Sequence, residues 1–105
     1  MSDPTTPVLR GVIVEDEIRF TLDELGRACR AERSQLVALV EEGVLHPAGR
    51  GPDDWRFGGD TLRRARTALR LARDLELGVA GTALVMELLD DIESLRSQLR
   101  RAGLR

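Results

Sequence analysis

Three carboxylates near the C-terminus have the type and the spacing to bind basic groups. Glu87, Asp90 and Asp91 lie in a predicted helix, and the two aspartates interrupt its apolar residues. Adjacent helical residues point about 100° apart, so one of the two aspartates must lie close to the apolar face. A carboxylate there could pair with a basic side chain of a partner protein. The alternative is an ion pair within the chain, with Arg70 or Arg73 of the preceding predicted helix.

Two further carboxylates, Glu41 and Glu42, end another predicted helix. They could extend the same acidic surface and steer a basic partner protein toward it. Charge runs of this kind are more often a solvated helix face, and that interpretation stays open for both residues.

The sequence lacks the residue combinations on which catalysis and metal binding depend. One cysteine, Cys29, and one histidine, His46, cannot form an internal disulfide or a Cys/His metal cluster. No Ser-His-Asp, Cys-His or paired-carboxylate arrangement is visible, and Gly49-Arg50-Gly51 does not match a phosphate-binding loop. We therefore expect a protein that is not an enzyme and that uses no metal and no cofactor.

Local signals predict four helices that carry the acidic residues. Thr21 and Glu24 can form a capping box, in which each side chain accepts a hydrogen bond from the backbone N–H of the other residue. Gly43 and Gly78 stand where the second and third helices should end. The predicted helices cover residues 22–30, 33–42, 61–77 and 79–101.

The last predicted helix carries an apolar seam with the spacing of a coiled coil. Its members recur every three or four positions, at Val85, Leu88, Ile92, Leu95 and Leu99. A small domain gains stability by burying such a seam, so we expect two copies of the chain to pair along it. The alternative is that the seam packs against the helix over residues 61–77 of the same chain.

The segment between the second and third helices predicts a β wing. Two short extended runs, residues 44–46 and 55–57, flank a loop rich in proline and glycine. The predicted fold is mainly α: a winged helix-turn-helix with a wing of two or three strands and a C-terminal antiparallel helix pair that includes the dimerisation helix. We expect one domain with three parts in order. Residues 1–7 form a disordered tail, residues 8–60 a strand segment with the helix-turn-helix and the wing, and residues 61–105 the helix pair.

Several motifs resemble those of known regulators. Four motifs follow one another along the chain: Phe20-Thr-Leu-x-Glu-Leu, Gly43-Val-Leu-x-Pro47, Trp55-Arg-Phe57 and Leu75-x-Leu-Gly78. In this order they resemble the motifs of MerR-type regulators. In those proteins a winged helix-turn-helix binds DNA and a long helix dimerises. The chain resembles more closely the chaperone-modulator family CbpM, over about residues 18–96. The most specific run of that resemblance is Leu88-x-Asp90-Asp91-Ile92-x-x-Leu95.

The resemblance implies a function in protein binding. CbpM-like proteins bind the J-domain of a DnaJ-type, CbpA-like co-chaperone and block its stimulation of an Hsp70-type ATPase. J-domains carry a basic helix, so the resemblance implies that the acidic side chains bind it: Glu41, Glu42, Glu87, Asp90 and Asp91. The chain departs from the family pattern at residues 8–17 and at Gly78-Val-Ala80.

The sequence also indicates where the protein acts. It shows no signal peptide and no apolar run long enough to span a membrane, which predicts a cytoplasmic protein. The resemblance adds an association with the nucleoid through the co-chaperone.

The alternative function is that of a small MerR-type DNA-binding transcriptional regulator. Arg33, Arg50 and Arg56 are the residues that could contact DNA, the last two from the predicted wing. Between residues 22 and 45, however, three arginines stand against five acidic residues. Because DNA affinity comes largely from neutralising phosphates, this balance favours protein binding over DNA binding.

Overall fold

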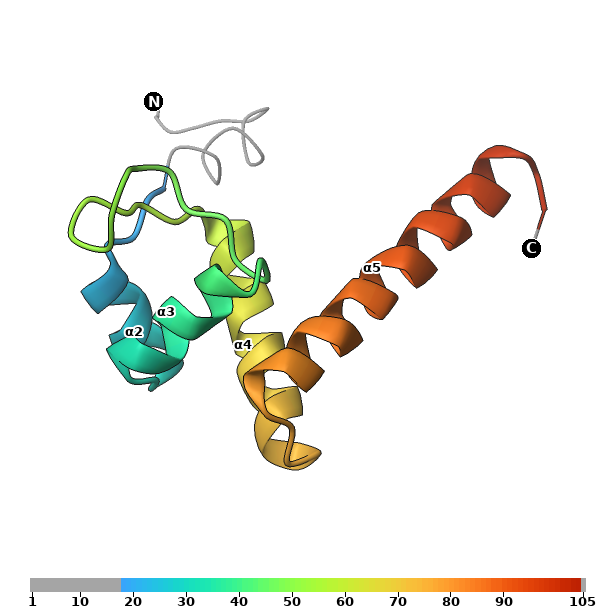
Figure 1. Ribbon diagram of the computed structural model, residues 1–105. Coiled ribbons are helices and arrows are strands. Elements are labelled where there is room, and N and C mark those ends of the chain that lie inside the picture. The colour runs from blue at the N-terminus through green and yellow to red at the C-terminus, as the bar shows by residue number, and fades with distance from the viewer. Residues whose placement is uncertain (1–17, 105) are drawn as a thin grey trace, which may run out of the picture.

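The computed structural model describes residues 18–104, and over this range the chain forms four helices. They are α2 (Leu22–Cys29), α3 (Arg33–Glu41), α4 (Gly59–Asp74) and α5 (Val79–Arg101). Helices α2, α3 and α4 lie together, whereas α5 leads away from them and ends far from the other three (Figure 1). The predicted mainly α character is confirmed. The predicted tail over residues 1–7 lies outside the described residues, and so does the part of the predicted strand segment up to residue 17.

Local hydrogen bonds decide where the first two helices begin. The predicted capping box is confirmed: the Thr21 hydroxyl accepts from the Glu24 N–H at 3.1 Å, and the Glu24 carboxylate accepts from the Thr21 N–H at 2.8 Å. Arg30, with a left-handed φ of 55°, then reverses the chain between α2 and α3. At the start of α3 the Gln35 side chain accepts from the Glu32 N–H at 2.8 Å. Each of these bonds satisfies a backbone donor that a helix end would leave unpaired.

We expect Thr21→Ala to lower the free energy of unfolding by about 1 kcal/mol, because it removes the side-chain cap of α2. The hydrogen bond from the Thr21 backbone N–H holds the pKa of Glu24 below its ordinary value. The stabilisation that the Glu24 carboxylate adds through this second bond, which Thr21→Ala retains, is present at neutral pH and is lost as the pH falls through the lowered pKa of Glu24. Urea denaturation followed by circular dichroism, at one fixed protein concentration, measures the difference, and the exposed Ser34→Ala is the control. Equal stability of Thr21→Ala and the wild type would contradict the prediction.

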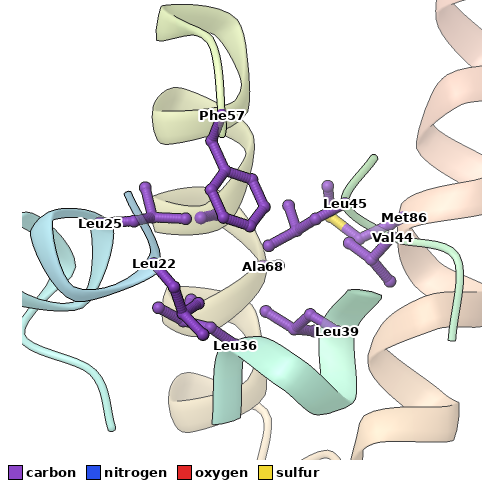
Figure 2. Close-up of a cluster of buried hydrophobic side chains, with 10 residues drawn as sticks. Leu22, Leu25, Leu36, Leu39, Val44, Leu45, Phe57, Ala68 and Met86 are labelled. Carbon is purple, nitrogen blue, oxygen red and sulfur yellow. The ribbon is translucent and has the colours of Figure 1, made fainter. Parts of the chain in front are cut away.

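The core gathers side chains from all four helices around Phe57. Figure 2 shows Phe57 pointing into the cluster, with Leu25 on one side and Leu45 on the other. Trp55 lies partly buried against it, with the two rings edge to face and their centroids 6.1 Å apart. The buried members are Leu22, Leu25, Leu36, Leu39, Val44, Leu45, Phe57, Ala65, Ala68 and Met86. Since Met86 belongs to α5, the core extends to the base of the long helix.

The prediction of a β wing is wrong: residues 18–104 contain no β-strand. What exists is two isolated antiparallel pairs, Phe20 with Phe57 and Ala48 with Arg56. Arg56 and Phe57 are neighbours but pair with different segments, so neither pairing extends into a ladder. Proline has no N–H to continue the pairing at Pro47, and α4 begins at Gly59, two residues after Phe57. The expected wing is therefore an irregular loop tied down at two points.

The turn between α4 and α5 comes earlier than predicted. Helix α4 begins two residues before the expected start and ends at Asp74, because Glu76 adopts a left-handed φ of 54°. Helix α5 begins at Val79 as predicted, and the Thr82 hydroxyl donates to the Gly78 carbonyl at 2.9 Å. From this turn the two helices run back in opposite general directions and diverge (Figure 1). Over residues 18–104, no helix combines the length and the apolar character needed to cross a membrane.

Candidate functional site

A groove of about 420 Å³ lies where the chain after α3 faces α5. Small and aliphatic side chains line it together with three carboxylates. The lining residues are Glu42, Gly43, Val44 and His46 after α3, Arg64 of α4, and Ala80, Ala83, Leu84, Glu87 and Asp90 of α5. We call this the acidic groove.

The structure brings together three of the five predicted partner-binding carboxylates and leaves two outside. Glu42, Glu87 and Asp90 line the acidic groove, although 45 residues separate Glu42 from Glu87 in the sequence. Glu41 and Asp91 are exposed and do not line it. Helical geometry explains the division, because the residue after Asp90 points about 100° away around α5.

Asp90 is held by an arginine that the sequence did not single out. Arg64 donates from its two Nη atoms to the two carboxylate oxygens of Asp90, each at 2.8 Å. The Arg64 Nε donates to the carbonyl oxygen of Val44 at 2.6 Å. These hydrogen bonds from Arg64 hold the pKa of Asp90 below its ordinary value, and the same pairing raises the pKa of Arg64.

Asp90 thus forms an ion pair within the chain, as the alternative prediction held, but its partner is a different arginine. Arg70 and Arg73 were the expected partners, whereas Arg73 contacts Asp74 at 3.2 Å and Asp90 pairs with Arg64. Arg64 lies 26 positions before Asp90, so no helical spacing could connect them. One feature of the sequence could have drawn attention to Arg64: it directly precedes Ala65, which lies on the apolar stripe of the same helix.

The predicted seam of α5 is exposed in the single chain. Beyond Met86, the last buried residue of this helix, the apolar side chains face outward. Val85 is half-buried at the base of the helix. The exposed fractions of the other seam residues are 51% for Leu88, 45% for Ile92, 57% for Leu95 and 43% for Leu99. The alternative of packing against α4 does not account for these four side chains.

The three arginines considered for DNA contact have different surroundings. Arg33 is engaged within the chain, at 2.9 Å from Asp53 and 3.4 Å from Asp23. Arg50 lies in the loop before Trp55, where its backbone N–H donates to Asp54 at 3.4 Å. Arg56 lines a separate hollow of about 300 Å³ at the start of α4, which neither of the other two lines.

Comparison with known proteins gives two consistent results. A family model described as MerR HTH family regulatory protein matches residues 20–102. The chaperone modulatory protein CbpM of Coxiella burnetii (strain Dugway 5J108-111) is 35% identical over 96 residues, which is 91% of each chain. The protein of the same name from Pseudomonas putida (strain W619) is 41% identical over 63 residues, or 60% of this chain and 62% of the relative. These names describe regulators and chaperone modulators, which points to a protein that is not an enzyme.

Proposed function

Because this chain belongs to the CbpM family of chaperone modulatory proteins, within the MerR helix-turn-helix class, we propose that it binds the J-domain of a DnaJ-type, CbpA-like co-chaperone. Binding covers the J-domain surface that an Hsp70 needs, and so inhibits stimulation of the Hsp70. The observation that carries this proposal is the acidic groove, where carboxylates from two separate segments surround one hollow. An acidic surface of this kind complements a basic helix and steers it toward the site.

Within the groove, the carboxylates have different roles. Glu42 and Glu87 stand on its two walls and are exposed, so a basic side chain can pair with either. Asp90 is already paired with Arg64 and supports the wall instead. Leu84, exposed beside Glu87, offers an apolar surface for the hydrocarbon part of an arginine or lysine. The groove therefore suits a long basic side chain presented by a helix.

Calorimetric titration of the full chain with the J-domain from the same genome tests the proposal at low and at moderate salt. We expect one J-domain bound per chain and an affinity that falls as salt rises, because exposed charge pairs are screened. Absence of binding by folded protein would overturn the proposal. In that case a shift of duplex DNA at low salt would favour the DNA-binding alternative, which the family model leaves as the second candidate.

The proposal includes a homodimer formed along α5. The spacing of Leu88, Ile92, Leu95 and Leu99 reads the same in both directions, so an antiparallel pair places each of these side chains opposite another seam residue. Charges on the helix favour the same orientation, because its acidic residues precede its basic ones. Outside the groove, the acidic residues are Asp91 and Glu93, and the basic ones are Arg96, Arg100 and Arg101. An antiparallel pair sets the acidic part of one copy beside the basic part of the other.

A further inference from the structure

The long helix is anchored beyond the core by one side-chain cluster. Met86 is the last buried residue of α5, and Asp90 lies one helical turn farther along. From Glu87 to Arg96 every side chain is exposed, so packing does not hold this part of α5 against the rest of the chain. The contact of Asp90 with Arg64 is therefore placed where it can set the direction of α5.

Arg64 joins the two walls of the acidic groove. Its Nε donates to Val44, on the wall after α3, and its Nη atoms donate to Asp90, on the α5 wall. Glu42 lies two residues before Val44, and Glu87 lies one turn before Asp90. A single guanidinium group therefore links the segment that carries Glu42 to the segment that carries Glu87.

The shape of the guanidinium makes this link directional. Arginine is planar, always charged, and presents its N–H donors in a fixed fork that matches a carboxylate. Here the two Nη groups donate to the carboxylate of Asp90, and the Nε–H donates to the backbone carbonyl of Val44. A lysine at this position would keep the charge, but its ammonium group could not hold both walls in the same geometry.

We propose that Arg64 is a positioning residue that holds Glu42 and Glu87 at the separation required by the basic partner, and that Asp90 acts through Arg64. This inference rests on the proposed function, since it assigns a role within the same groove. It differs from the expectation that Asp90 itself contacts the partner.

The separation of the walls can be measured without any partner. Spin labels at Glu41→Cys and Asp91→Cys, in a Cys29→Ser background, lie outside the groove, one at the end of α3 and the other on α5. Dilution with unlabelled protein isolates the distance within one chain. We expect one narrow distance distribution with Arg64 present and a broad one in Arg64→Lys and in Asp90→Asn. Arg70→Gln, an exposed arginine on the same helix, should leave the distribution narrow. An unchanged distribution in Arg64→Lys, with helicity intact, would overturn the positioning role.

Affinity for the J-domain is the second measurement, made on unlabelled protein. We expect Arg64→Lys and Asp90→Asn each to weaken binding by roughly 3- to 30-fold, and the double variant to be no weaker than either. Additive losses would show that Asp90 contacts the partner directly and would overturn the inference, as would unchanged affinity despite broadened distances. If the wild type did not bind the J-domain but the distances still broadened, the proposed function would fail while the role of Arg64 in spacing the walls would stand.

Discussion

Ile92→Glu is expected to convert the proposed dimer into monomers at concentrations at which we expect the wild type to be dimeric. Each copy contributes one Ile92 to the seam, and burial of such a side chain is worth roughly 1.5–3 kcal/mol. The substitution removes two of these contributions and places two carboxylates in an apolar interface. Since 1.4 kcal/mol is a tenfold change, we expect the dissociation constant to rise by at least about 100-fold. Sedimentation equilibrium over a range of concentrations measures it.

The matched control is Ser94→Glu, which adds the same charge to the same helix at an exposed position outside the seam. It should remain dimeric, and both variants should keep the helical content of the wild type. An association constant that Ile92→Glu does not alter would show that this seam does not pair two copies.

Cysteine pairing separates the two orientations of the dimer. In a Cys29→Ser background, Leu88→Cys and Leu99→Cys proteins are mixed and oxidised. An antiparallel pair brings Cys of one variant opposite Cys of the other, so the mixed disulfide should exceed either homodisulfide. A parallel pair would give the homodisulfides instead, because it aligns each position with itself.

Reversal of the charges of Glu42 and Glu87 is expected to weaken J-domain binding strongly. We expect the double variant Glu42→Arg and Glu87→Arg to weaken J-domain binding by about 10- to 100-fold at low salt, since like charges across an interface repel and attractive pairs are lost. The remaining affinity should no longer fall with salt. Titration calorimetry gives the affinity, and the J-domain-stimulated ATPase rate of the Hsp70 reports the inhibition, which should weaken in parallel.

A second double variant separates the groove from the overall charge. Glu41→Arg with Asp91→Arg makes the same change in net charge at exposed residues next to the groove. We expect a modest loss, through weaker steering alone. If this pair weakened binding as much as the groove pair, the effect would belong to the whole acidic surface, and the assignment to Glu42 and Glu87 would be wrong.

The helices could be predicted because their boundaries depend on nearby residues. The capping box of Thr21 and Glu24 spans three positions, and it starts α2 where expected. Periodic apolar residues gave the bounds of α5 in the same way. The end of α4 was harder to predict, because the left-handed residue is Glu76 rather than a glycine, and a glutamate carries no signal for that conformation.

The wing was predicted wrongly because strand formation depends on more than the residues of one segment. Residues 44–46 and 55–57 have the composition of strands, but a strand also needs a second segment held in register along several residues. Here Arg56 pairs with Ala48 while Phe57 pairs with Phe20, so the pairing partners change after one residue. Burial of Phe57 in the core decides this arrangement, and the burial arises only when the helices are assembled.

The sequence alone determined the four helices, the family motifs, the acidic residues and the apolar seam, because each depends on residues within a few positions of one another. Only the tertiary structure decided which acidic residues meet. In the folded chain Asp90 meets Arg64 and Glu87 lies across the groove from Glu42, while Glu41 and Asp91 stay outside the groove. These contacts join segments that are distant in the sequence, and packing between distant segments, such as that of Met86 against the core, leaves no mark in local spacing.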